Sequence, residues 1–241
     1  MEILPYTGFI IASFIAAGIA TLAGFGSSTL LIPIAIMFMP LRQAVFLVAC
    51  FHLFNNIFKV KAFYKNIDKK TAILFGVPSI IMSFTGAMLI SILPADAIKT
   101  SIAVFLLVFL GYSWLKPDFK IKDTGGTAIA GGAASGFLAG LIGMGGAIRG
   151  VFLMAFGLPK SVYVGTSAAI ALVIDCTRVP TYILTGAVGE KSGFLLIPFL
   201  VISAYFGVKT GKKYLDQIDQ DTFRKIVLAA LSLVAIKLLF T

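Results

Sequence analysis

Long stretches without any charged side chain constrain this chain more than any other feature. Such runs, mostly apolar, cover residues 3–41, 71–95 and 124–148. Each reaches or exceeds the roughly 20 apolar residues that a helix needs to cross a bilayer. Charged residues make up only 12% of the 241 residues, against about 25% in soluble domains. The sequence therefore predicts an all-α membrane protein with several spans and excludes a water-soluble fold.

The net charge of +10 does not indicate a nucleic-acid partner. The basic residues lie mostly between the apolar runs, where they act as topological anchors beside lipid headgroups. No polar stretch is long enough to fold separately, so we expect residues 1–241 to form a single membrane transport domain. The N-terminus shows no signal-peptide pattern, and Cys50 and Cys176 show no metal-binding spacing. We predict no cofactor and no metal.

The two halves of the chain are related in sequence. Aligning Gly24 with Gly143 also aligns Gly26 with Gly145, and the same register pairs the residues Pro40 with Pro159, Asn56 with Asp175, and Lys59 with Arg178. Such self-similarity indicates an internal repeat. We place repeat 1 at about residues 5–116 and repeat 2 at about residues 124–241.

Each repeat is predicted to hold one long interrupted segment and three further helices. The expected segments are 8–40, 44–64, 71–92 and 98–115, then 127–158, 162–185, 192–211 and 222–240. Residues 8–40 and 127–158 are too long for one span and too short for two, and glycines near their middles disfavour a continuous helix.

The basic residues help to decide whether these broken segments cross once or turn back. If both turn back as re-entrant hairpins, the two repeats are inverted, and only Arg42, Lys99, Lys191 and Lys237 lie on the outer side. The positive-inside rule favours this arrangement over single crossings, which split the basic residues almost evenly. We therefore predict two inverted repeats, each a broken or re-entrant helical hairpin followed by three transmembrane helices, as in secondary transporters.

The paired motifs resemble those of a known family. LAGFGSSTLLIPIAIMFMP at residues 22–40 and LIGMGGAIRGVFLMAFGLP at residues 141–159 are similar to the repeats of the TauE/SafE sulfite exporters. The resemblance covers both halves and implies a permease for small sulfur-containing anions such as sulfite or organosulfonates. The first copy departs from the usual glycine run by reading GFGSS.

The glycine motifs are candidates for anion binding. Glycine-rich backbone that opens beside a helix start exposes N–H donors at the positive end of the helix dipole. Close helix packing is the alternative role for any of these glycines. The candidate residues are Gly24, Gly26, Ser27 and Ser28 in repeat 1 and Gly143, Gly145 and Gly146 in repeat 2.

Charged residues inside the apolar segments are the second group of candidates. Arg149 follows the second motif, where its planar fork suits an oxyanion, a headgroup or a carboxylate. Asp175 and Arg178 share a helix face, as do Asn56 and Lys59. Asp175 is a candidate proton or cation carrier or a structural partner of an arginine. Asn56, Lys59 and Arg178 are candidates for binding the substrate, and snorkelling to an interface is the alternative role of Lys59 and Arg178.

Three further polar residues complete the candidate set. His52, the only histidine, is a candidate for coupling or ion pairing. Paired with Ser27 or Ser28, it also raises the alternative of an intramembrane serine hydrolase. Thr166 and Ser167 are possible donors to the substrate, although such residues also join membrane helices.

The sequence thus predicts an anion carrier that works by alternating access, with export as the preferred direction. Export of an anion needs no coupling ion, because a cell interior about 100 mV negative drives each charge out by roughly 2.3 kcal/mol. Proton- or sodium-coupled uptake through Asp175 stays open as an alternative, and so does a homo-oligomer. We expect the bacterial inner (plasma) membrane as the location and the lipid bilayer as the environment.

Overall fold

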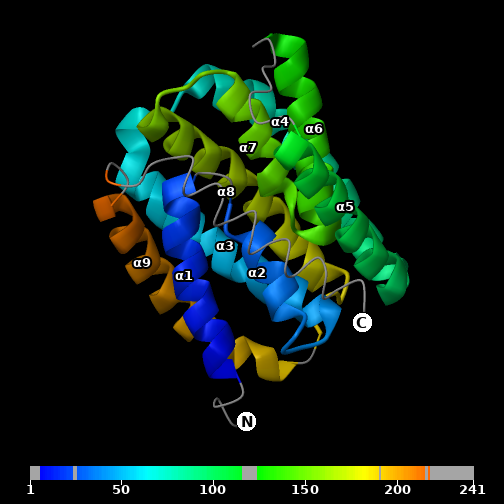
Figure 1. Ribbon diagram of the computed structural model, residues 1–241. Coiled ribbons are helices and arrows are strands. Elements are labelled where there is room, and N and C mark those ends of the chain that lie inside the picture. Colours follow the sequence, from blue (N-terminus) through cyan, green and yellow to red (C-terminus); the bar gives the residue numbers. More distant parts are fainter. Residues whose placement is uncertain (1–5, 24–25, 116–123, 190, 215–216, 218–241) are drawn as a thin grey trace.

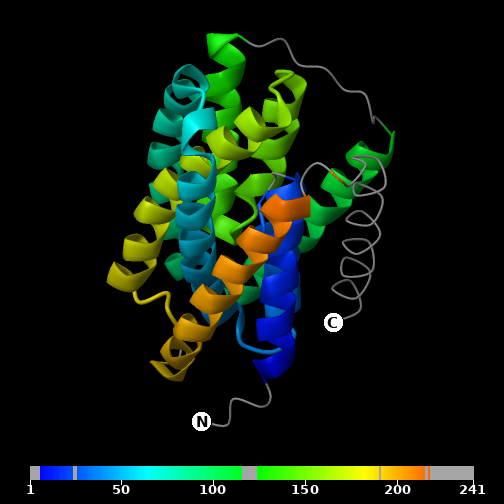
Figure 2. The ribbon, with the colours of Figure 1, turned by 90° about the vertical axis from the view of Figure 1, so that its left-hand side faces the viewer.

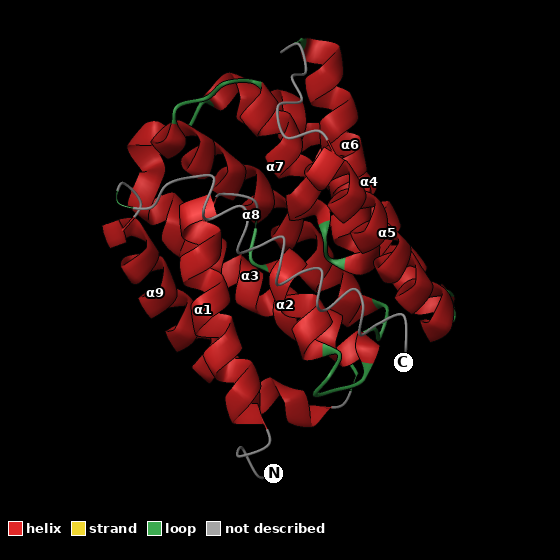
Figure 3. Ribbon diagram, viewed as in Figure 1, coloured by secondary structure: helices red, strands yellow, loops and turns green. Residues whose placement is uncertain are grey.

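The computed structural model describes residues 6–23, 26–115, 124–189, 191–214 and 217, and its regular elements there are all helices (Figure 3). Gly24 and the predicted helix 222–240 lie outside these residues. The helices are α1 (Thr7–Ala23), α2 (Ser28–Ala35), α3 (Leu41–Phe63), η2 (Tyr64–Asn66), α4 (Lys69–Ile92), α5 (Ala95–Leu115), α6 (Gly125–Ile142), α7 (Gly145–Ala155), α8 (Lys160–Leu184), η3 (Lys191–Leu196) and α9 (Ile197–Tyr214).

Both long segments are divided into two helices, as the sequence predicted. Gly26, between α1 and α2, has a φ of +92°, and Gly143, directly after α6, has a φ of +74°. Glycine adopts these left-handed values without the steric penalty of a side chain. In Figures 1 and 2, α2 runs back toward the end of the molecule where α1 begins, and α7 runs back toward the end where α6 begins. The two hairpins enter the molecule from opposite ends.

Several helices are suited to a bilayer by length and composition. Five stretches of the described chain qualify: Leu41–Asn66, Lys69–Ile92, Gly125–Ile142, Lys160–Leu184 and Gly193–Tyr214. On α4, the exposed side chains Ile73, Val77 and Ile81 recur every fourth residue and form an apolar stripe. An exposed apolar face of this kind marks a surface that meets lipid or another helix.

Glycines let two pairs of helices pack backbone to backbone. Gly132, Gly136 and Gly140 of α6 face α4, and a Cβ on Gly136 would collide with the backbone of Ser79. The Ser79 hydroxyl donates to the Gly132 carbonyl at 2.9 Å. Small residues four positions apart are the usual means of close packing between membrane helices. Similarly, Gly207 of α9 lies directly against α1.

Helices α3 and α8 pack against each other, and the short helices α2 and α7 touch. Figure 1 shows α3 and α8 crossing the middle of the molecule, with α2 and α7 beside them. The fold therefore brings the two repeated motifs to one central place.

Candidate functional site

The two glycine turns meet at the centre of the molecule. A Cβ placed on Gly26 would lie 3.2 Å from the Cα of Gly146, 3.4 Å from Nε2 of His52 and 3.5 Å from Nη2 of Arg149. A Cβ on Gly143 would collide with Ile32 and lie 3.4 Å from Nη1 of Arg178. Both turns therefore bring bare backbone close to basic side chains. A larger residue would collide at Gly143, and at Gly26 it would be crowded and strained by the positive φ.

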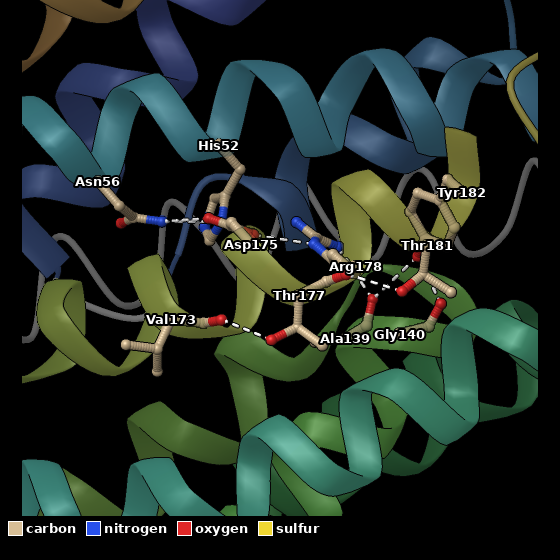
Figure 4. Close-up of polar contacts among 10 residues, drawn as sticks. All are labelled: His52, Asn56, Ala139, Gly140, Val173, Asp175, Thr177, Arg178, Thr181 and Tyr182. Carbon is tan, nitrogen blue, oxygen red and sulfur yellow. Dashed lines mark hydrogen bonds and ion pairs between the residues drawn. The ribbon is translucent and has the colours of Figure 1, made fainter. Parts of the chain in front are cut away.

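Asp175 is the centre of a buried polar network (Figure 4). Its Oδ2 accepts hydrogen bonds from Nδ1 of His52 and Nδ2 of Asn56, both at 2.8 Å. Its Oδ1 accepts from Nε of Arg178 at 2.8 Å. His52 and Asn56 lie one turn apart on α3, whereas Asp175 and Arg178 lie one turn apart on α8, so the carboxylate joins the two central helices.

Arg178 also fixes the end of α6. Its Nη1 donates to the Ala139 carbonyl at 2.9 Å, and the hydroxyl of Tyr182 donates to the Gly140 carbonyl. The last carbonyls of a helix have no partner within the helix, so these side chains satisfy them beside the Gly143 turn. Tyr182 was not among the predicted site residues, and its sequence match to Phe63 in the other repeat gave no indication of this role.

Arg149 is buried beside the glycine turns, and no carboxylate of the described residues pairs with it. It is 2% exposed, and its Nε donates to the hydroxyl of Ser167 at 2.9 Å. Among the described residues, the ion pairs are those of Asp175 with His52 and with Arg178. The sequence-based alternatives for Arg149, a carboxylate partner or a reach to a headgroup, are not what this geometry shows.

Lys59 is similarly buried, at 3% exposure. Its Nζ donates to the Ala20 carbonyl near the end of α1 at 3.2 Å, and no carboxylate of the described chain pairs with it. The expectation that Lys59 or Arg178 reaches an interface does not agree with this burial. Each instead holds the end of the first helix of a hairpin.

The start of α2 contributes hydroxyl groups. Ser27, Ser28 and Thr29 are buried, and the Ser27 hydroxyl accepts from the amide of Asn55 at 2.9 Å. Asn55 was not among the predicted residues, although it shares a helix face with His52. Its Oδ1 and the Thr29 hydroxyl are buried without a hydrogen-bond partner in the described structure.

Two predicted residues have local structural contacts of their own. The Thr166 hydroxyl accepts from the backbone N–H of Asp68 at 2.9 Å and so ties α8 to the start of α4. Gly145 faces the backbone of Ser135, whose hydroxyl donates to the Gly145 carbonyl at 2.8 Å. These contacts join helices and do not require a ligand.

The buried cluster carries unbalanced charge. Arg149 and Arg178 supply two guanidinium groups, Lys59 adds an amine, and Asp175 supplies the one carboxylate among these four side chains, all at 3% exposure or less. A buried charge without a partner costs several kcal/mol, so an excess of positive charge here favours an anion as the missing partner.

Comparison with known proteins gives a family. No curated protein and no solved structure matches the chain. A family model described as "Sulfite exporter TauE/SafE" matches residues 9–238 and spans both hairpins. The resemblance inferred from the paired glycine motifs is confirmed. The chain belongs to the TauE/SafE family of sulfite exporters.

Proposed function

We propose that this protein carries a small sulfur-containing anion, sulfite or an organosulfonate, out of the cell through the central site. Members of the family are membrane transporters and not enzymes, so the serine hydrolase alternative is wrong. The geometry agrees, because the Ser27 hydroxyl is bonded to the amide of Asn55, whereas Nε2 of His52 has no hydrogen-bond partner among the described residues.

The unbalanced positive charge is the observation that carries this proposal. An oxyanion beside Gly26 and Gly146 would face the Nη groups of Arg149, whose planar fork matches two oxygens at once. The buried hydroxyls of α2 supply further donors. Binding of the anion compensates the buried charge, so the site gains most from a ligand that is negative.

The packing of the helices supports alternating access between inverted repeats. Under the sequence alignment of the two halves, α1 corresponds to α6 and α4 corresponds to α9. The contacts α1–α9 and α4–α6 are therefore equivalent. Gly207 packs on α1 and Gly86 packs on α6, and these two glycines pair when a gap of two residues is allowed in the alignment of the two halves. In transporters of this architecture, one repeat moves against the other around a fixed central site.

The membrane potential favours export over uptake. Each negative charge leaves a cell interior about 100 mV negative with a gain of roughly 2.3 kcal/mol, so export needs no ion gradient. Uptake coupled through Asp175 would require a carboxylate that is free to take a proton or cation. Asp175 already accepts three hydrogen bonds, which favours a structural role for it.

Flux of labelled sulfite into proteoliposomes under an imposed potential tests the proposal. We expect potential-driven flux without a proton or sodium gradient, and competition by thiosulfate or taurine reports the anion class. Flux that starts only when a proton or sodium gradient is added would favour coupled uptake. No sulfite flux under any gradient would contradict the substrate assignment.

Replacing Arg149 tests the site itself. Loss of a hydrogen bond to a charged group costs about 1.5–3 kcal/mol, so Arg149→Gln should lower sulfite flux about 10- to 100-fold. Arg149→Lys keeps the positive charge but loses the planar fork, so its sulfite flux should lie between the flux of Arg149→Gln and that of the wild type. Arg42→Gln is the matched control, because Arg42 is an exposed arginine that bonds the carbonyls of Ser91 and Leu93. Equal flux in Arg149→Gln and Arg42→Gln would remove Arg149 from the site.

A further inference from the structure

His52 has one nitrogen bonded and one without a partner. Nδ1 lies 2.8 Å from Oδ2 of Asp175. Nε2 is buried and has no hydrogen-bond partner among the described residues. It faces the Gly26 turn, beside Nη2 of Arg149. A buried imidazole nitrogen without a partner is unfavourable, so its position at the anion site needs an explanation.

The bond to Asp175 fixes which nitrogen carries the proton. A carboxylate held by Arg178 is ionised and only accepts hydrogen bonds, so Nδ1 of His52 must donate to it. The amide nitrogen of Asn56 donates to the same oxygen at 2.8 Å and also lies 2.9 Å from Nδ1. An amide nitrogen is only a donor, so it gives Nδ1 no acceptor, and an Nδ1 without a proton would set its lone pair against the carboxylate. In the neutral imidazole, Nε2 therefore presents a lone pair to the site.

A lone pair repels an anion that has no proton of its own. We infer that the central site binds its anion together with a proton, which lies between Nε2 of His52 and an oxygen of the anion. The inference rests on the proposed function and names His52 as the group that sets the protonation state of the substrate complex.

The proton reaches this position in either of two equivalent ways. A hydrogen oxyanion brings an O–H group, which donates to Nε2. A fully deprotonated anion requires a proton from the water phase; the Nε2 lone pair takes it, and the imidazolium N–H then donates to the anion. Asp175 stabilises the imidazolium through Nδ1. The bound complex is the same in both cases, and with sulfite it keeps one negative charge, on which the membrane potential acts.

Few charged side chains of the described residues lie near His52. Asp175 and Arg178 face it from α8 and Arg149 from α7, and Lys59 lies on its own helix. The described parts of α1 and α2 carry no ionisable carboxylate or amine, and Asp96 and Lys99 of α5 are exposed, as are the lysines of η2 and α9. Among these groups, Nε2 is the acceptor that lies open to the glycine turns.

Methanesulfonate is the sharpest probe, because it carries no proton near neutral pH. When it binds to the purified protein in weakly buffered detergent, a pH indicator should report uptake of about one proton per bound anion. Its apparent Kd should rise about tenfold per pH unit on the alkaline side. Sulfite, measured by competition, reports occupation of the same site.

The single histidine of the chain allows a second measurement on the wild-type protein. With ¹⁵N-labelled histidine and the purification tag removed, the only imidazole signals come from His52. We expect the neutral Nδ1–H form without ligand and protonation of both nitrogens with methanesulfonate. This measurement does not depend on a variant that folds.

His52→Gln and Cys50→Ser complete the test. His52→Gln keeps an amide donor but has no titrating nitrogen, so methanesulfonate binding should persist, weakened, with no proton uptake and no pH dependence. Cys50→Ser changes another buried ionisable side chain of α3 and should keep the proton uptake. Binding by the wild type without proton uptake and with a neutral imidazole would overturn the inference and leave the proposed function in place. Absence of binding by both sulfite and methanesulfonate would overturn the proposed function, and the inference with it.

Discussion

At the scale of single residues, Asp175 joins parts of the chain that are far apart in sequence. It accepts from His52 and Asn56 of α3 and from Arg178 of its own helix, and Arg178 continues the network to the end of α6. All four side chains are buried. Breaking a buried ion pair by removing one partner costs about 3–5 kcal/mol, whereas removing both costs less.

This coupling predicts a non-additive pair of substitutions. Asp175→Asn and Arg178→Gln should each lower the free energy of unfolding by about 3–5 kcal/mol, because each leaves a buried charge unpaired. The double variant should lose clearly less than the sum. Thermal unfolding in detergent measures the cycle, with Arg42→Gln as the control. Additive losses would show that the pair does not act as a unit.

The sequence predicted the type of site and some of the partners within it. Arg149, Arg178 and Asp175 were recognisable as candidates because a charged side chain inside an apolar segment is unfavourable unless it is paired or binds a ligand. The spacing of Asp175 and Arg178 on one helix already gave their ion pair as an alternative, and the pair is present. The bonds of Asp175 to His52 and Asn56 were not predicted, because they depend on how α3 and α8 are rotated against each other. Two neighbouring residues illustrate what the sequence does not predict. Thr166 ties α8 to the start of α4, whereas Ser167 contacts Arg149.

At the scale of elements, glycine has two separable tasks in this protein. Gly26 and Gly143 permit the left-handed turns that break the hairpins, while Gly132, Gly136 and Gly140 permit the close approach of α6 to α4. The sequence predicted the breaks from glycines at the middle of overlong segments. It left the role of individual glycines open, because close approach depends on which helix lies opposite.

A pair of alanine substitutions tests the close packing of α6 on α4. Gly136→Ala places a Cβ on the backbone of Ser79 and should lower the melting temperature, because the backbone of α4 has to move. Gly125→Ala lies at the start of the same helix with no atom within 4 Å of the new Cβ. It should be neutral or stabilising by up to about 1 kcal/mol. Similar melting temperatures for both variants would contradict the close packing of α4 on α6.

At the scale of the whole molecule, the opposite entry of the two hairpins predicts a membrane topology. Under the inverted arrangement, the turn at Asn66 faces the cytoplasm together with Lys61, Lys65, Lys69 and Lys70, and the exposed loop at Gly186 faces outward. In a variant with Cys50 and Cys176 replaced, Asn66→Cys should react with a membrane-impermeant thiol reagent only after the membrane is opened. Gly186→Cys should react in intact cells. The reverse pattern would refute the proposed orientation.

The hydrogen bond between Asn56 and Asp175 has a consequence for the origin of the chain. The two residues occupy equivalent positions of the two halves, so each meets its own counterpart, as residues on a two-fold axis do. In an ancestor built from two identical subunits, aspartate there would face aspartate, and two carboxylates so close repel each other. Duplication and fusion into one gene allow one copy to become an amide donor and the other to keep its charge. A fused chain can therefore hold an asymmetric polar centre, with an amide on one side and a carboxylate on the other, which a symmetric pair of identical subunits cannot.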